Sequence, residues 1–148
     1  MVSKKLLKPE WIFSIITLSV VVLDQLSKFL IRLFQPDWTL SFLKIQFIKN
    51  TGAGFGILAG QNLWLGIVSL AVALGLMLNY KKLPKDNFAQ VCFALFLGGA
   101  IGNMIDRLFV GYVTDFINLQ FWPAFNIADS ALSIAIVGLM IYYFKKKE

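Results

Sequence analysis

The sequence contains no histidine and a single cysteine, Cys92. The lack of histidine excludes the Ser-His-Asp triad and the Cys-His pair. One cysteine forms neither an internal disulfide nor a thiolate metal cluster. We therefore expect neither a metal nor a cofactor. If the chain is an enzyme, its acid–base groups must come from Asp, Glu, Lys or Tyr.

Charged residues are scarce as well, at 15% of the 148 residues, whereas 58% are hydrophobic. The mean hydropathy is +0.73. A soluble domain of this length would have about a quarter of its residues charged. The composition therefore predicts a membrane protein, mainly α, in which residues 1–148 form one integral membrane domain.

Four apolar stretches are long enough to cross a bilayer, because about 20 helical residues cross the hydrocarbon. They predict transmembrane helices at approximately residues 11–34, 63–80, 88–105 and 128–144. Basic residues before the first, between the second and third, and after the fourth all fall on one side, which the positive-inside rule makes cytoplasmic. These residues are Lys4, Lys5, Lys8, Lys81, Lys82, Lys85, Lys145, Lys146 and Lys147. We expect both termini to be cytoplasmic, and the net charge of +6 to indicate anionic lipid rather than nucleic acid.

The two outer loops have the patterns of strands. Leu43, Ile45 and Phe47 alternate with polar residues, which is typical of a half-buried strand. The stretch LFVGYVTDFI in the second outer loop is rich in Val, Phe and Tyr, which favour strands. We expect the two strands to pair into a small extracytoplasmic sheet on the membrane surface.

Charged residues also occur inside the first predicted span. Asp24, Lys28 and Arg32 follow one another at intervals of four residues, so they share one face of a helix. Two interpretations stay open at this point. The three residues are either an ion pair that lets the helix tolerate its charges, or charged groups positioned in a site.

The outer end of the third predicted span carries Asn103, Asp106 and Arg107. We expect Asp106 and Arg107 to form a charge network that orders the strand after them. Gly98 and Gly102 in the same span make a G-x-x-x-G face for close helix packing.

Two acids stand out in the segment VTDFINLQFWPAFNIADS. Taken singly, Asp115 is a strand-end acid and Asp129 is the N3 residue of a helix capped by Asn126. If the two carboxyl groups converge, they cannot both ionise cheaply and will share a proton. Such a pair supplies one carboxylate as general base for a water and one carboxylic acid that polarises a carbonyl.

The segments LDQLSK, NTGAGFG, GGAIGNMIDRLFVGYVTDFI and FNIADS occur in this order on the four predicted spans. In these segments the sequence resembles bacterial lipoprotein signal peptidase, also called signal peptidase II. The resemblance implies an aspartic peptidase of the inner (cytoplasmic) membrane, with its site at the extracytoplasmic interface. It would cut the signal peptide from prolipoproteins just before the diacylglyceryl-modified cysteine, beneath a cradle of outer strands.

The resemblance also assigns residues. It implies a catalytic dyad of Asp115 and Asp129. It further implies residues that shape and support the site, namely Asp24, Lys28, Asn50, Gly52, Asn103, Arg107 and Asn126. The expected partners are a lipid-modified prolipoprotein and membrane lipids, with no nucleic acid, and we expect a monomer. One departure is that Gly54 follows Ala53 where the family usually has two alanines.

A competing hypothesis is a small polytopic transporter or proton-conducting protein, in which Asp24, Lys28 and the outer acids form a relay. That class predicts internal repeats and paired spans broken by Gly or Pro, and the sequence shows neither. A purely structural membrane subunit would leave both aspartates replaceable.

Overall fold

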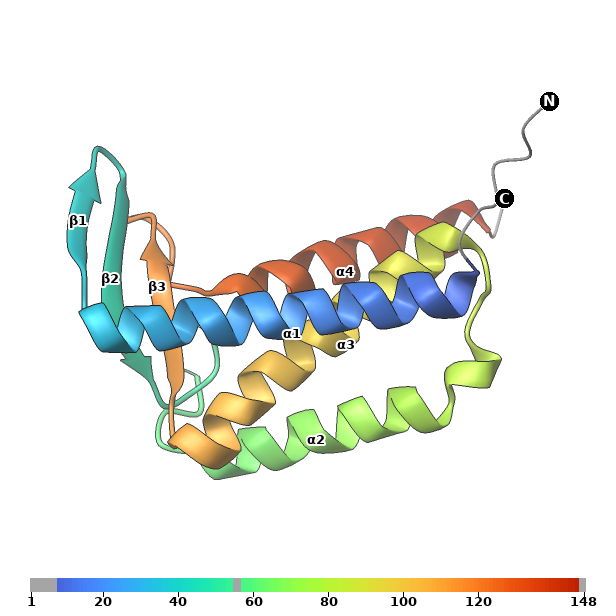
Figure 1. Cartoon of the computed structure of the whole chain (residues 1–148), viewed down its shortest axis with the longest axis horizontal. Helices are drawn as coiled ribbons and strands as arrows, with labels where there is room; N and C mark the ends of the chain where they lie inside the picture. The colour runs from blue at the N-terminus through green and yellow to red at the C-terminus, as the bar shows by residue number, and fades with distance from the viewer. Residues whose placement is uncertain (1–7, 55–56, 147–148) are drawn as a thin grey trace.

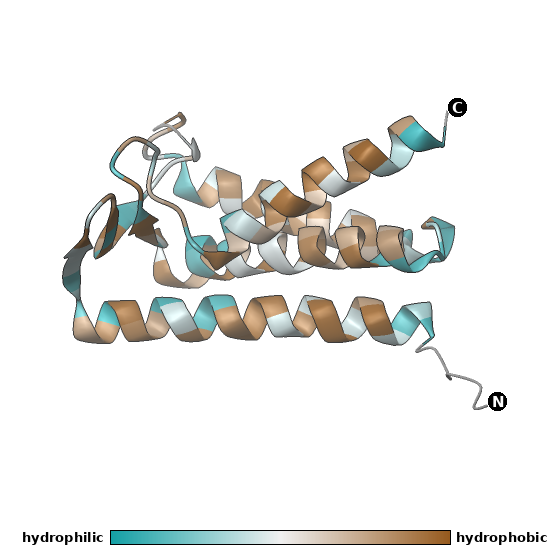
Figure 2. Ribbon diagram, turned by 90° about the horizontal axis from the view of Figure 1, so that it is seen from above, coloured by the Kyte–Doolittle hydropathy of each residue, from teal (hydrophilic) through white to brown (hydrophobic). Residues whose placement is uncertain are grey.

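Four long helices run alongside one another with a small sheet at one end in the computed structural model, which describes residues 8–54 and 57–146 (Figure 1). The helices are α1 (Pro9–Phe34), α2 (Asn62–Leu78), α3 (Asn87–Ile105) and α4 (Ile127–Lys145). Most residues of the helices are hydrophobic, and hydrophilic residues occur at both ends of the bundle and at a few positions between them (Figure 2). Of the lysines used to predict the orientation, Lys4, Lys5 and Lys147 lie outside the described residues.

Three segments in the described ranges are long and apolar enough to cross a membrane, namely Pro9–Phe34, Asn87–Val110 and Ile127–Lys145. The second span is shorter than predicted. Helix α2 has 17 residues and ends at Leu78 rather than at residue 80, so it is not among these three segments. The Asn79 side chain explains the early end, since its Nδ2 donates to the Gly75 carbonyl oxygen at 2.9 Å. A short 3₁₀ helix, η2 (Tyr80–Lys82), then turns the chain toward α3.

Helix α3 lies at the centre and packs against α1, α2 and α4. Glycines make the close approach possible. A Cβ added at Gly98 would lie 2.7 Å from the Cβ of Val20 in α1, and one at Gly99 would lie 2.6 Å from the Ala128 carbonyl oxygen in α4. The predicted face of Gly98 and Gly102 packs against α1, since a Cβ at Gly102 would lie 2.6 Å from Asp24 Oδ2, and the unpredicted Gly99 faces α4.

The sheet is antiparallel with the order β1 (Asp37–Leu40), β2 (Leu43–Asn50) and β3 (Val113–Asn118). The predicted pairing of the two outer loops is confirmed as β2 against β3. Strand β1 was not predicted and adds a hairpin to the free edge of β2.

The prediction of a strand over the whole of LFVGYVTDFI is wrong in its first half. Residues Asp106–Val110 continue α3 as a π-helical turn, η3, in which the Gly111 amide donates to the Asp106 carbonyl at 2.9 Å. The turn ends at Gly111, whose φ of +88° suits a residue without a Cβ. Composition favoured a strand here, but the glycine that ends the helix comes only at residue 111.

Candidate active site

The two acids singled out in the sequence are delivered by β3 and α4. Asp115 is a buried residue of β3, and Asp129 lies in the first turn of α4. The chain between them folds back on itself, because Ile117 and Phe125 exchange two backbone hydrogen bonds of 2.9 and 3.0 Å. This pairing forms a neck that closes the loop of residues 118–124 and brings the strand end next to the helix start.

Asn126 joins the two acids. Its Nδ2 donates to Asp115 Oδ1 at 2.8 Å, and its Oδ1 accepts from the Asp129 amide at 2.9 Å. The Asn126 amide donates in return to Asp129 Oδ2 at 3.1 Å, which completes a capping box. The predicted cap of α4 is thus confirmed, and the capping residue also binds the second acid.

Two further asparagines complete the hydrogen bonds of the acids. Asn103 Nδ2 donates to Asp129 Oδ1 at 2.7 Å, and Asn50 Nδ2 donates to Asp115 Oδ2 at 2.8 Å. Asn50 Oδ1 accepts from the Gly52 amide at 2.9 Å, which fixes its orientation. A Cβ at Gly52 would lie 2.8 Å from a backbone oxygen across the turn, so the turn requires glycine. All four carboxylate oxygens therefore accept one hydrogen bond.

The charges of α1 form a buried network behind the acids. Lys28 Nζ lies 2.7 Å from Asp24 Oδ2 and 3.4 Å from Asp106 Oδ2. Asp24 Oδ1 accepts from the Ala128 amide at 2.9 Å, in the first turn of α4. Lys28 Nζ also donates to Asn103 Oδ1 at 2.9 Å. The predicted ion pair is present, and the network reaches the site.

Asp106 and Arg107 have different contacts. Asp106 Oδ2 accepts from the Thr114 amide at 2.9 Å, so this acid orders β3 as expected. Two hydrogen bonds of Arg107 are made outside β3. Its Nη2 donates to the Gly52 carbonyl at 3.2 Å, and its carbonyl accepts from Asn62 Nδ2 at 2.9 Å. The Arg107 guanidinium instead stands beside the acids of the site.

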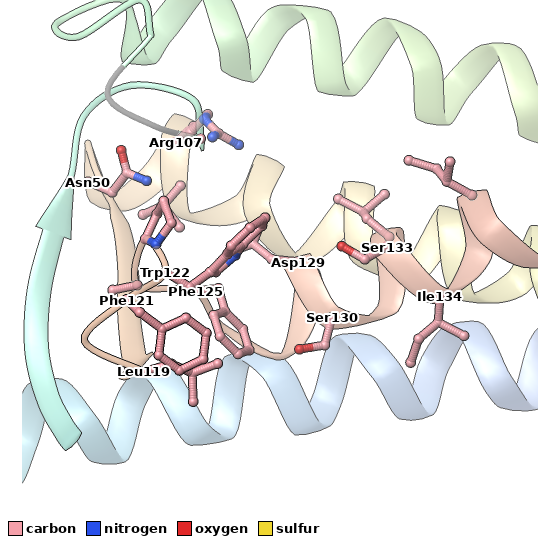
Figure 3. Close-up of a pocket in the computed structure, with 16 residues that line it drawn as sticks. Asn50, Arg107, Leu119, Phe121, Trp122, Phe125, Asp129, Ser130, Ser133 and Ile134 are labelled. Atoms are coloured by element: carbon pink, nitrogen blue, oxygen red, sulfur yellow. The ribbon is translucent and has the colours of Figure 1, made fainter. Parts of the chain in front are cut away.

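A cavity of about 610 Å³ opens beside Asp129 (Figure 3). Its polar end holds Asn50, Arg107 and Asp129. Its apolar walls come from the 119–125 loop and from α4, and include Leu119, Phe121, Trp122, Phe125, Leu132, Ile134 and Ile136. The aromatic wall was not predicted as part of the site, although the run QFWPAF beside the acids is its signal.

A second cavity of about 270 Å³ approaches Asp129 from the side of α2 and α3. It shares Gly54, Arg107, Asp129 and Leu132 with the larger one. The remaining walls are largely apolar, for example Val72 and Phe96. A Cβ at Gly54 would meet no atom within 4 Å, so the alanine usual in the family would fit here. The arrangement suits a ligand with apolar arms that meet at a polar centre.

The environment of Asp115 places its titration near neutral pH. Burial and the negative charge of Asp129 raise the pKa of the Asp115 carboxyl to about 7, although hydrogen bonds from Asn50 and Asn126 favour its charged form. A carboxyl group with such a pKa exchanges protons readily at physiological pH, as a general acid or base must. In the part of the chain that the structure describes, no three His, Cys, Asp or Glu side chains form a cluster that could hold a metal ion.

Comparison with known proteins gives one consistent family. Residues 16–145 match the family described as signal peptidase (SPase) II. The lipoprotein signal peptidase of Moorella thermoacetica is 42% identical over a match that covers 86% of this chain and 89% of that protein. The lipoprotein signal peptidase of Aquifex aeolicus is 38% identical, with 95% and 90% covered.

Solved structures agree with the sequence matches. A bacterial membrane enzyme solved at 2.3 Å resolution superposes with a TM-score of 0.84 at 33% identity, covering 92% of this chain and 89% of that one. A second, solved at 1.9 Å, gives a TM-score of 0.78 at 34% identity, with 90% and 92% covered. The chain therefore belongs to the signal peptidase II family of membrane proteases.

Proposed function

We propose that the protein is an aspartic endopeptidase that removes the signal peptide from diacylglyceryl-modified prolipoproteins, cutting before the lipidated cysteine. One observation carries the proposal. Asp115 and Asp129 are bonded to the same residue, Asn126, and Asp129 lies at the polar end of a cavity with apolar walls. Membership of the family supports the removal of signal peptides from prolipoproteins.

The buried charges support a dyad that shares one proton. Besides the dyad, the site and the network behind it contain the carboxylates of Asp24 and Asp106 and three cations. The cations are Lys28, Arg32 and Arg107. The whole group is electrically neutral when Asp115 and Asp129 together carry a single negative charge. Because net charge is costly where water is scarce, this protonation state is favoured.

The roles of the two acids follow from their surroundings. Asp129 lies in the first turn of α4, where the helix dipole stabilises a carboxylate, so it acts as the general base for water. Asp115, whose pKa is raised to about 7, holds the proton and donates it toward the scissile carbonyl oxygen. Water attacks the carbonyl carbon and passes its proton to Asp129, and this proton leaves with the amine when the C–N bond breaks.

The proposed substrate fits the proposed orientation of the molecule. A prolipoprotein held by its signal helix and two acyl chains presents its scissile bond at the membrane interface, where water is available. We place the dyad at the extracytoplasmic interface of the bacterial inner membrane, with four spans and both termini cytoplasmic. Lys82 and Lys145 support this, since they end η2 and α4, whose last residues lie at the end of the molecule remote from the sheet (Figure 1). Because one chain supplies every residue of the site, a monomer suffices.

Replacement of either acid tests the proposal. In Asp115→Asn and Asp129→Asn, we expect processing of a lipid-modified prolipoprotein, followed by gel mobility, to slow by roughly 10²–10⁴-fold, because a general acid or base is lost. The matched control is Asp37→Asn, an outer acid whose side chain is 72% exposed, and it should process normally. Normal processing by either dyad variant would refute the proposed dyad, whereas no processing by the unaltered protein would favour a transporter or a structural subunit.

A further inference from the structure

Three serines line the two cavities, namely Ser69, Ser130 and Ser133. Two of them are bonded within their own helices. Ser69 Oγ donates to the Leu65 carbonyl at 2.9 Å, and Ser130 Oγ donates to the Asn126 carbonyl at 3.0 Å. A bond to the carbonyl four residues earlier is a common way for a helix to satisfy a serine hydroxyl.

Ser133 of α4 is the exception. It is exposed on the wall of the larger cavity, and its hydroxyl has no hydrogen-bond partner among residues 8–54 and 57–146. The hydroxyl oxygen is turned toward the end of the cavity that holds Asp129 (Figure 3). The adjacent wall residues Leu132 and Ile134 are apolar and offer no side-chain acceptor. The cavity therefore contains a hydrogen-bond donor that is available to a ligand.

The position of this donor relative to the dyad limits what it can bind. Ser133 lies four residues after Asp129 in α4, which is about 6 Å along the helix axis. In this direction α4 leads away from the sheet (Figure 1), and therefore into the membrane in the proposed orientation. If Asp129 acts at the peptide bond before the modified cysteine, the Ser133 hydroxyl faces groups of the substrate that lie slightly deeper than that bond.

The diacylglyceryl-modified cysteine has hydrogen-bond acceptors at this depth. About six covalent bonds connect its Cα to the carbonyl carbon of the nearer acyl ester, a reach of up to about 8 Å. An ester has no donor, and its carbonyl oxygen loses the hydrogen bonds of water when it enters an apolar cavity. The peptide carbonyls of the signal helix differ, because they are already bonded within that helix.

We infer that Ser133 is a specificity-determining residue that donates a hydrogen bond to an ester carbonyl of the diacylglyceryl group in the larger cavity. The inference rests on the proposed function, because it concerns the substrate of the same site. The hydroxyl distinguishes ester-linked chains from chains of equal length without carbonyls. It takes no part in the hydrolytic step, so its loss weakens substrate binding and leaves turnover unchanged.

Two substrates and one variant test the inference. The first substrate is a diacylglyceryl-modified prolipoprotein, and the second carries the dialkyl ether analogue, in which a methylene replaces each ester carbonyl. For the unaltered protein we expect kcat/KM to be about fivefold higher for the ester, because a neutral hydrogen bond has about this effect. Ser133→Ala should process both substrates equally, since KM for the ester rises about fivefold at constant kcat.

Two further variants serve as controls. Ser133→Thr keeps a hydroxyl and should retain the preference for the ester. Ser19→Ala removes another exposed serine, from α1, which lines neither cavity and likewise has no hydrogen-bond partner in the described ranges. This variant should show the same kinetics as the unaltered protein with both substrates.

The inference is overturned if the unaltered protein processes the two substrates equally, or if Ser133→Ala keeps the preference for the ester. A serine that only stabilises α4, or that donates to a peptide carbonyl, would change both rates by the same factor and leave the preference intact. Failure of the proposed function is distinguishable, because it would appear as normal processing of the ester by Asp115→Asn or as no processing by the unaltered protein.

Discussion

At the scale of single residues, the surroundings of Asp115 determine how the protein responds to pH. The pKa of this carboxyl is raised from 3.8 to about 7 by burial first and by the charge of Asp129 second. The folded protein therefore retains a proton at pH values between about 4 and about 7 that the unfolded chain has lost. Above that window, the buried carboxylate is charged in both states.

The first prediction concerns this window. The free energy of unfolding should decrease as pH rises from about 4 to about 7 and then level off, because the folded state binds more protons than the unfolded state there. The processing rate should also decrease as pH rises through about 7, as the dyad loses its shared proton. Unfolding midpoints in detergent and initial rates across this range measure both effects. A midpoint independent of pH, or one that rises over the window, would contradict the assignment; in Asp115→Asn the contribution of this group should be absent.

Part of the site could be predicted from single residues and part could not. Asp129 at N3 and Asn126 at the N-cap follow from local helix rules, and the structure confirms that cap. The missed contacts are those between elements distant in sequence. Asn62 reaches the Arg107 carbonyl from another helix, and Arg107 turns to the cavity instead of joining Asp106. Such contacts depend on how helices pack, which no local pattern encodes.

At the scale of elements, the glycines of α3 determine how closely α1 and α4 pack against it. Gly98 and Gly99 contact different neighbours, because they lie next to each other in sequence and so face different directions on the helix. The contact of Gly99 is with a backbone oxygen, which cannot move aside without displacing the first turn of α4. That turn carries Asp129.

We therefore expect Gly99→Ala to lower the free energy of unfolding by about 1–3 kcal/mol, as overpacking does, and to reduce processing by shifting Asp129. The control is Gly75→Ala in α2, where an added Cβ meets no atom within 4 Å. That variant should be neutral or up to about 1 kcal/mol more stable, because alanine favours a helix. Thermal unfolding in detergent compares the two. Equal midpoints would refute the packing argument.

The elements missed from the sequence each have a local cause. Strand β1 consists of four exposed residues that show no alternation of burial, so no periodicity indicated it. Helix η3 carries β-branched and aromatic residues that favour strands, but hydrogen bonding continued from α3 outweighs their preference. The early end of α2 depends on one side-chain bond of Asn79.

At the scale of the whole molecule, the proposed four spans depend on α2. Its 17 residues give a length of about 26 Å, slightly less than the hydrocarbon thickness of about 30 Å. The three residues of η2 extend it, and a bilayer thins locally around a short span at modest cost. In the proposed topology the lysines of η2 would lie at the interface on the side away from the sheet.

Reporter fusions test this topology. Green fluorescent protein fused after Glu148 should fluoresce, because a cytoplasmic C-terminus lets it fold. Alkaline phosphatase fused after a truncation within the 119–124 loop should be active, because that loop is expected outside. The reciprocal pair of fusions serves as the control and should be inactive. If only α1, α3 and α4 crossed the membrane and the N-terminus were cytoplasmic, the 119–124 loop would be cytoplasmic and the C-terminus would be outside. The two reciprocal fusions would then be the active ones.

The neck formed by Ile117 and Phe125 separates two tasks that share one stretch of chain. Its backbone hydrogen bonds hold the strand end and the helix start together without using any side chain. The aromatic residues of the loop that the neck closes, Phe121 and Trp122, are therefore not needed to set the distance between Asp115 and Asp129. Side chains of the loop of residues 118–124 can therefore be replaced without moving the carboxyl groups of Asp115 and Asp129. We therefore expect the composition of this loop to tolerate more change than the backbone pairing that closes it.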